Sequence, residues 1–515
     1  MSVSRRKFFK QSGVLAGTAF AFPNVARAVE PAAARPGQRP RHIIHLVSDG
    51  MSLGTLTCAD HFAQATRGRG LAWVQLYRQR AAQTAWVNMR SLNSLVTDSA
   101  AASTGWGSGS RVKNGAVNVL PDGRKLHPLC ALFGEAGWAR GLVTTTEITH
   151  ATPAGFAANV DDRACADTIA AQYLERRLDV MLGGGRQFFN PAKRKDKRNL
   201  LADFRAQGYA VLEKWSDLAS APTDKRWLGV FASGHLPFTL DHLADEKLKA
   251  TVPTLAEMTR AALKRLERLP HFLLQVEGGR VDHGAHNSDA AAALHDQIAF
   301  DEALELCLTF QHRHPDTLLV ITTDHGNSNL GLNGMGTKYS SSSHHFAHLS
   351  QIKKSLPELV KDIKKGAEAP GVVEITLADG TTKREVYRVP PTHIIDVVGA
   401  ATGYQVPPAK AELLSQHLAN TVQPVYEQMN SPLAQLGQLL ANYHGIGWTG
   451  NSHTADYVPL VALGPGAERF RGFLQNTDVF RHYLALGKID FRNPELPLLA
   501  ECGPSASEVE RHEFV

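Results

Sequence analysis

Short, nearly continuous apolar segments alternate along the chain with segments of helical periodicity. The apolar segments are rich in β-branched residues and lie at 43–47, 141–145, 179–182, 272–276, 318–322 and 458–463. Strands covered on both faces show this pattern, because neither side of the strand faces water. One amphipathic segment between them begins with Thr254-Leu255-Ala256-Glu257, which has the spacing of a helix capping box. The pattern predicts an α/β fold, a three-layer sandwich in which helices flank a central, mostly parallel β-sheet.

The alternation changes between residues 336 and 444. This stretch contains a helical segment at 349–365 and a pattern typical of a β-hairpin at 372–389, with Asp379-Gly380 at its turn. We therefore predict an inserted, crown-like region over 336–444. It could cover a binding site of the main domain or mediate contacts with a partner, and both roles stay open.

The amino-terminal segment has the three parts of a secretory signal. Arg5-Arg6 precede an apolar stretch at 13–22, and Ala26-Arg27-Ala28 follows as a small-residue cleavage site. The paired arginines, followed by Phe8 and Phe9, resemble a twin-arginine signal and predict export to the periplasm or beyond. The predicted boundaries are a signal peptide at 1–28, a linker at 29–40, a main domain at 41–335 and 445–515, and the insertion at 336–444.

Composition excludes several classes of protein. The chain has 515 residues, is 43% apolar and contains no apolar run long enough for a membrane span in the mature chain. A formal net charge of +6 without a concentrated basic stripe argues against nucleic acid as a partner. Five scattered cysteines form no disulfide framework that the sequence could define, and we expect most of them to be small core residues.

The segment at 96–104 contains the candidate nucleophile. Ser99 follows Asp98 and is followed by Ala100-Ala101-Ala102 and Ser103. Such small residues bury little apolar area, so we expect the first turn of a helix with an accessible amino end rather than a core segment. Unpaired N–H groups and the helix dipole would then favour a tetrahedral anion beside Ser99.

Carboxylates and imidazoles follow several of the predicted strands. These residues are Asp49, Glu277, Asp282, His286, Asp324 and His325, and His453 precedes the last predicted strand. In a parallel sheet they would meet at the carboxyl edge. Clustered carboxylates repel one another unless cations hold them. Mixed Asp and His ligands favour zinc, and an all-oxygen set favours magnesium. The residues therefore predict a two-metal phosphotransfer site with a covalent phosphoserine.

Over nearly the whole mature chain the sequence resembles the alkaline phosphatase family, more weakly between 335 and 444. The matching motifs are Asp49-Gly50-Met51, the segment around Ser99, Ala151-Thr152-Pro153-Ala154, Leu182-Gly183-Gly184-Gly185, the segment 277–286, Asp324-His325 and the loop around His453. Ser103 stands where the family prefers Gly or Ala. The resemblance implies an alkaline phosphatase that hydrolyses small phosphate monoesters to an alcohol and inorganic phosphate, with two zinc ions and one magnesium ion. A homodimer is one possible assembly, and the sequence does not decide the oligomeric state.

The resemblance also implies a role for each site residue. One zinc would be held by Asp282, His286 and His453, and the second would be surrounded by Asp49, Asp324, His325 and the Ser99 oxygen. The third metal, usually magnesium, would take Asp49, Thr152 and Glu277. Arg163 would bind two phosphate oxygens, because its planar guanidinium carries two parallel N–H donors that match two oxygens at once.

Two histidines differ from the best-known bacterial pattern. His150 stands in place of an aspartate next to the magnesium site, so the third site could also accept zinc or cobalt. His283 stands in place of a lysine that reaches phosphate through water. Both histidines occur together in other branches of the family, so we expect His150 to lie beside the ligands and His283 to face the substrate.

Three other classes of protein are alternatives to a phosphomonoesterase. A sulfatase needs a modifiable residue in the frame Cys/Ser-x-Pro-x-Arg. The Cys-x-Pro of this chain, Cys502-Gly503-Pro504, has Ala506 at the arginine position, which argues against a sulfatase. Phosphodiesterases of related fold generally lack the arginine that holds a dianion, so Arg163 favours monoesters. A non-catalytic envelope protein that binds metal or phosphate is the alternative from a different class.

Overall fold

The computed structural model describes residues 38–368, 370–377 and 380–498. The predicted signal peptide lies outside these residues, as do most of the predicted linker and the segment that contains Cys502. Within the described part of the chain, no helix combines the length and the hydropathy that crossing a bilayer requires.

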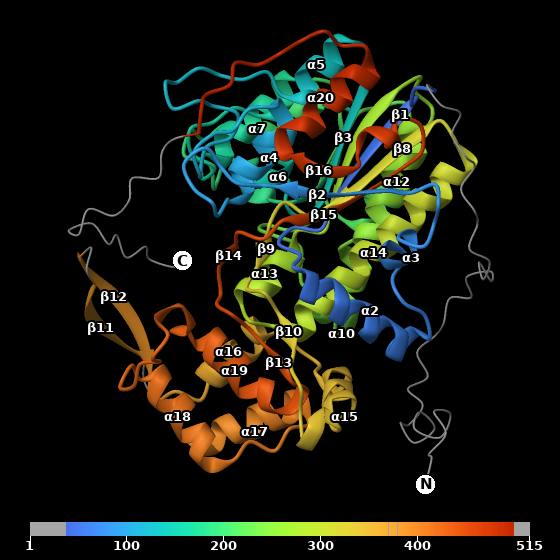
Figure 1. Ribbon diagram of the computed structural model, residues 1–515. Coiled ribbons are helices and arrows are strands. Elements are labelled where there is room, and N and C mark those ends of the chain that lie inside the picture. The colour runs from blue at the N-terminus through green and yellow to red at the C-terminus, as the bar shows by residue number, and fades with distance from the viewer. Residues whose placement is uncertain (1–37, 369, 378–379, 499–515) are drawn as a thin grey trace.

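A 10-stranded sheet forms the centre of the molecule (Figure 1). Its strands, in spatial order, are β16 (Gly472–Gln475), β2 (Gln83–Asn88), β15 (Val458–Leu463), β8 (Thr317–Thr322), β1 (His42–Val47), β7 (Phe272–Glu277), β3 (Ala139–Glu147), β4 (Val180–Gly184), β6 (Trp227–Val230) and β5 (Ala210–Leu212). Strand β15 is antiparallel to both of its neighbours, and the other pairs in this sheet are parallel. The predicted fold class, a mostly parallel sheet between helices, is confirmed.

Each of the six predicted strands is present within a few residues of its expected bounds. Four strands of the central sheet were not predicted, namely β2, β5, β6 and β16. Strand β2 is half-exposed and carries Gln83, Thr84 and Asn88, and β5 and β6 have only 3 and 4 residues. Short or half-exposed strands lack the continuous apolar run on which the prediction depended.

Helices cover both faces of the sheet. Successive side chains of a strand point to opposite faces, and in β1 Ile44 and Leu46 belong to one apolar cluster while Ile43 and Val47 belong to the other. The first cluster is covered by α2 (Leu53–Arg67), α3 (Ala72–Leu76), α9 (Trp215–Ala219), α10 (Thr239–Ala244), α11 (Glu246–Thr251), α12 (Leu255–Leu266) and α14 (Ala290–Arg313). The second is covered by α4 (Ser99–Ser108), α5 (Leu129–Glu135), α6 (Ala151–Ala157), α7 (Ala166–Glu175), α8 (Leu200–Ala206) and α20 (Asn476–Gly487).

The predicted capping box begins α12. The Thr254 hydroxyl accepts a hydrogen bond from the Glu257 backbone N–H at 3.2 Å, and the Glu257 carboxylate accepts one from the Thr254 N–H at 2.8 Å. Two backbone donors that a helix start leaves unpaired are thereby satisfied.

Helix α4 begins at Ser99 as predicted, but the expectation that its small residues avoid the core is wrong. All ten of its residues are buried, and Trp106 joins the apolar cluster of that face. The small side chains let α4 approach α6 closely: a Cβ on Gly107 would collide with the carbonyl of Gly155, and a Cβ on Gly155 would collide with Ser103. Close helix packing therefore explains these small residues as well as access to an anion does.

Beyond residue 335 the chain forms a second group of elements. They are α15 (Ser342–Ala347), α16 (Leu356–Lys364), β11 (Pro370–Leu377), β12 (Gly380–Tyr387), α17 (Pro391–Thr402), α18 (Pro408–Leu418) and α19 (Pro432–His444). The pairing of β11 with β12 confirms the predicted hairpin. Figure 1 shows these elements, in yellow to orange, on the side of α13 (Arg280–His286) that faces away from the sheet. Their apolar side chains continue the first cluster, and the division at 336 and 444 stays a prediction.

The described cysteines fit the expectation of small core residues. Cys58, Cys130 and Cys307 are buried free thiols, and Cys165 is a half-buried one. Burial raises the pKa of Cys58 to about 11, so this thiol stays protonated and inert at neutral pH.

Candidate active site

Adjacent strands bring the predicted carboxylates to one edge of the sheet. Val47, at the end of β1, is level with Thr322 of β8 and with Glu277 of β7. Asp49 and Asp324 each follow their strand by two residues, so both emerge at this edge beside Glu277. All three carboxylates have 0% of their surface exposed. The carboxyl ends of parallel strands thus assemble the acidic side chains where the sequence placed them.

His453 reaches the same edge because β15 runs against the other strands. It lies in β14 (His453–Thr454), which pairs with β9 (Gly326–Asn327) directly after His325. The segment that precedes an antiparallel strand arrives at the edge where its parallel neighbours end. His453, which precedes its strand, therefore meets the ligand residues that follow the parallel strands.

The first of three candidate metal-ligand groups contains Asp282, His286 and His453. The Nε2 atoms of the two imidazoles lie 3.0 Å apart, and each faces an Asp282 oxygen, at 3.4 Å from His286 and 3.7 Å from His453. Both Nδ1 atoms are hydrogen-bonded to backbone carbonyls, at 2.6 Å for His286 and 2.8 Å for His453. Carbonyls only accept, so the protons lie on Nδ1 and two Nε2 lone pairs face each other. This is the orientation of metal-binding histidines, and a cation would remove the repulsion.

The second group contains Asp49, Asp324 and His325, and Ser99 lies beside it. The Ser99 hydroxyl oxygen is 3.2 Å from His325 Nε2, which lies 3.1 Å from an Asp324 oxygen and 3.6 Å from an Asp49 oxygen. Asp49 Oδ1 is buried without a hydrogen-bond partner within the described residues. A buried carboxylate oxygen without a donor is costly unless a cation contacts it.

The third group contains Asp49, His150 and Glu277. Glu277 Oε1 and His150 Nδ1 lie 3.9 Å apart, and neither has a hydrogen-bond partner in the described chain. The Thr152 hydroxyl donates to Asp49 at 3.3 Å, so the predicted third-site residues Asp49, Thr152 and Glu277 also come together. Asp49 belongs to two groups and lies between them.

Charge repulsion and burial act together on these carboxylates. Burial and the neighbouring Asp324 and Asp282 raise the pKa of Asp49 well above its usual value. Burial raises the pKa of Glu277 to about 7. Burial also opposes ionisation of Asp282, but His286 and His453 outweigh it and lower the pKa of this carboxyl group. Orphaned oxygens, oriented imidazoles and raised pKa values all fit divalent metal ions in this donor set.

Arg163 lies between the nucleophile and the third group. Its guanidinium donates to Asp98 Oδ2 at 3.0 Å and to His150 Nε2 at 3.0 Å. Asp98 is also the N-cap of α4, where its other oxygen accepts from the Ala101 N–H at 2.9 Å. The residue before Ser99 thus fixes the helix start and the arginine together, a role that the sequence analysis did not assign to Asp98.

Three further residues of the site were not predicted. His235 lies in the loop after β6, and its ring centroid is 4.4 Å from that of His283 and 5.7 Å from that of His150. Asn327 donates to Asp282 at 2.6 Å and orients it, and Arg280 donates to His283 at 2.7 Å. If β6 had been predicted as a strand, His235 would have been expected at the carboxyl edge of the sheet. For Asn327 and Arg280 the sequence offered only their position next to predicted metal ligands.

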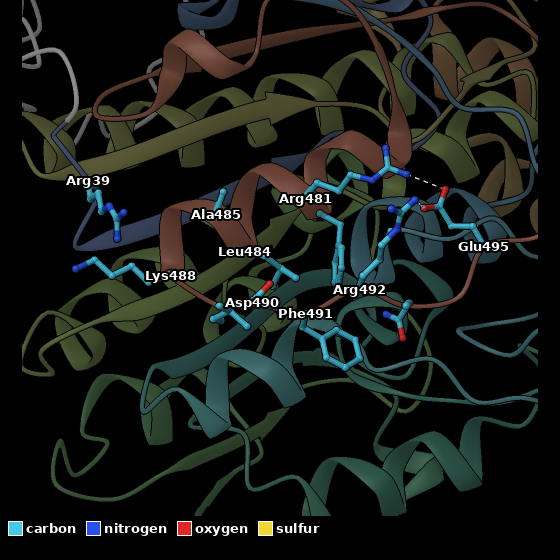
Figure 2. Close-up of a pocket in the computed structure, with 13 residues that line it drawn as sticks. Arg39, Arg481, Leu484, Ala485, Lys488, Asp490, Phe491, Arg492 and Glu495 are labelled. Carbon is cyan, nitrogen blue, oxygen red and sulfur yellow. Dashed lines mark hydrogen bonds and ion pairs between the residues drawn. The ribbon is translucent and has the colours of Figure 1, made fainter.

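A surface hollow elsewhere shares none of these residues. Figure 2 shows it beside α20, lined by Lys488, Phe491 and neighbouring side chains. Two of its arginines, Arg481 and Arg492, pair with Glu495 at 2.7 and 2.9 Å. Arg481 also pairs with Asp478 at 2.7 Å, so each of these two arginines has a carboxylate partner.

The fold and the three ligand groups first define a class: an α/β enzyme candidate whose serine adjoins metal-binding carboxylates and imidazoles. The family model described as alkaline phosphatase matches residues 40–489. Alkaline phosphatase 3 of Bacillus subtilis is 30% identical over 86% of this chain and 88% of its own length. The streptomycin-6-phosphate phosphatase of Streptomyces griseus is 34% identical over 61% of this chain and 80% of its own. The crystal structure of the Thermus thermophilus alkaline phosphatase superposes with a TM-score of 0.80 and 34% identity, covering 93% of this chain and 98% of that one. The chain belongs to the alkaline phosphatase family.

Membership of this family confirms the predicted resemblance and the predicted class of enzyme, a phosphoric monoester hydrolase. The metal-ligand groups agree with the metal dependence of the family. The identity of the metals and the role of each residue belong to the proposal that follows.

Proposed function

We propose that the protein hydrolyses phosphate monoesters through a covalent phosphoserine on Ser99. The observation that carries this proposal is the position of the Ser99 hydroxyl, 3.2 Å from His325 Nε2 and at the first residue of α4. A serine among metal-binding groups needs no neighbouring histidine base for activation. The positive end of the helix dipole adds stabilisation for the phosphate.

We propose zinc for two of the ligand groups and magnesium for the third, where zinc or cobalt are alternatives. The proposed ligands are Asp282, His286 and His453 for one zinc, Asp49, Ser99, Asp324 and His325 for the other, and Asp49, Thr152 and Glu277 for magnesium, with His150 beside the third site. When bound, these ions would neutralise the carboxylates, lower the pKa of the serine hydroxyl and offset charge on the transferring phosphoryl group.

The chain's own residues then perform the transfer. Arg163 binds two non-bridging oxygens of the phosphate dianion, and the Ser99 oxygen attacks phosphorus opposite the departing alcohol. Water afterwards attacks the phosphoserine from the vacated side and releases inorganic phosphate. Each displacement inverts the configuration at phosphorus, so the two together give net retention.

A comparison of two substrates tests this function. The zinc- and magnesium-loaded enzyme should turn over p-nitrophenyl phosphate with a kcat/KM at least about 10²-fold above that for bis-p-nitrophenyl phosphate, because only the monoester offers a dianion to Arg163. A preference for the diester would identify a phosphodiesterase instead. Tight binding of phosphate without turnover of either substrate would identify a non-catalytic binding protein.

Arg163→Ala is expected to lower kcat/KM for the monoester by about 10² to 10³-fold and to weaken inhibition by phosphate, because the paired donors are lost. Arg163→Lys should recover only part of the loss, since an ammonium group cannot reproduce two parallel hydrogen bonds. Steady-state kinetics measure both effects. Arg124→Ala, which removes an exposed arginine paired with Asp122, is the control and should leave kcat/KM unchanged. An unchanged phosphate affinity in Arg163→Ala would contradict the role.

Export and domain organisation are proposals that rest on the sequence. We propose twin-arginine export on the pattern of residues 1–28, and an inserted region at 336–444 in a catalytic domain made of 41–335 and 445–515. The export proposal can be tested with a reporter fused behind residues 1–28. The reporter should be secreted, and the double substitution Arg5→Lys and Arg6→Lys should abolish its secretion.

A further inference from the structure

Helix α13 places an arginine behind His283, the histidine that we expect to face the substrate. Arg280 and His283 are three residues apart and so lie on one face of the helix. The Arg280 guanidinium is 2.7 Å from His283 Nδ1. A guanidinium can only donate, so Nδ1 accepts this hydrogen bond and the proton of the neutral imidazole lies on Nε2. Arg280 thereby fixes the tautomer of His283.

Arg280 carries its charge near carboxylates that do not pair with it directly: burial lowers its pKa to about 10, while Asp296, Asp241 and Asp282 favour the charged form. Its guanidinium lies over the ring of Phe238, 3.7 Å from the centroid, and no ion pair joins it to an acidic residue in the described part of the chain. Arg163, by contrast, is paired with Asp98 at 3.0 Å. A half-buried cation held by an aromatic face and an imidazole keeps its positive charge available to an anion nearby.

His283 lies on the same side of the candidate active site as Arg163. The His283 ring packs on His235, with centroids 4.4 Å apart, and lies 5.7 Å from the ring of His150, which accepts a hydrogen bond from Arg163. Within the described residues, His283 Nε2 has no hydrogen-bond partner. An N–H group without a partner, polarised by a cation behind it, is a donor for phosphate oxygens directly or through water.

We propose that Arg280 is a positioning residue that acts through His283, fixing its Nε2–H tautomer and supplying the permanent positive charge that a phosphate dianion requires there. The proposal rests on the proposed function, because it concerns the same phosphate site. In this pair the imidazole donates the hydrogen bond and the arginine contributes the charge.

A double-mutant cycle tests the proposal. Arg280→Met keeps an unbranched stem beside Phe238 but removes the charge and the donor. In the zinc- and magnesium-loaded parent it should weaken the affinity for inorganic phosphate, measured by calorimetry, and raise KM for p-nitrophenyl phosphate, each by about 10-fold, with kcat changed by less than about 3-fold. In a His283→Lys background the same substitution should change both by less than about 2-fold, because the lysine carries its own charge and has no tautomer to fix. Arg280→Lys, which keeps the charge, should restore part of the affinity.

Each outcome discriminates. An equal loss in both backgrounds would mean that Arg280 only packs α13 against Phe238 and would overturn the proposal. Unchanged phosphate affinity of Arg280→Met in the parent would overturn it as well. Phosphate affinity is measured without turnover, so a parent that binds phosphate but hydrolyses no monoester would refute the proposed function, while the background-dependent loss would still support the role of Arg280. Melting temperatures of all variants show whether each has folded.

Discussion

Ser99→Ala is expected to abolish the phosphoenzyme and to lower kcat for phosphate monoesters by about 10³-fold or more. The hydroxyl is the atom that would bond to phosphorus, and it lies beside His325, Asp49 and Asp324 at the first residue of α4. Without it, only direct attack by water would remain. The binding groups for phosphate persist, so the variant should still bind inorganic phosphate.

Trapping at mildly acidic pH followed by peptide mass spectrometry measures the phosphoenzyme. Ser103→Ala is a matched control, since Ser103 lies one turn further along α4, is equally buried and donates to the Ala100 and Ala151 carbonyls rather than to the ligand groups. It should keep the phosphate on residue 99. Phosphate found on any other residue of the parent enzyme would overturn the covalent scheme.

Removal of the metal ions is expected to stop turnover and to lower the melting temperature by an amount that grows between about pH 5 and pH 8. Metal ions bind the folded chain and compete there with protons for the same carboxylates and imidazoles. The buried carboxylates at the ends of β1, β7 and β8 repel one another when nothing neutralises them. The metal-free chain should therefore become less stable as these groups ionise.

Glu277 shows most directly why the metal-free chain should lose stability as the pH rises. Burial raises its pKa from 4.5 to about 7 in the folded, metal-free chain. A carboxyl group with a raised folded pKa stabilises the fold below its unfolded pKa and loses that contribution as the pH rises through the folded pKa. The loss falls between pH 4.5 and about 7, and for this one group it is on the order of 3 kcal/mol. The raised pKa of Asp49, caused first by burial and then by Asp324, acts in the same direction.

Thermal melts with and without a chelator, across this pH range, measure the effect. Glu277→Gln removes the titrating group, so the metal-free variant should lose less stability than the metal-free parent between the same pH values. Glu135→Gln, at the exposed end of α5, is the control and should follow the parent. A melting-temperature difference that stays constant with pH would contradict a role for carboxylate repulsion.

The strongest sequence predictions were those in which local pattern and chemistry coincide. Buried parallel strands need nearly continuous apolar runs, so the ends of β1, β7 and β8 could be located, and with them Asp49, Glu277 and Asp324. The start of α4 was predicted from the run of small residues that follows Ser99, and the structure shows Asp98 as its N-cap. Half-exposed or very short strands such as β2 and β6 left too little periodicity to identify.

The sequence by itself determined the α/β class and the ends of the central strands, and it identified most of the carboxylates and imidazoles that meet in the candidate metal-ligand groups, because each depends on a few neighbouring residues. Only the tertiary structure decided how distant segments meet. The reversed direction of β15 carries His453 to His286, the close packing of α4 on α6 buries small residues that were expected to stay outside the core, and the loop after β6 brings His235 against His283. These contacts depend on strand direction and on the fit between elements, which local pattern does not record.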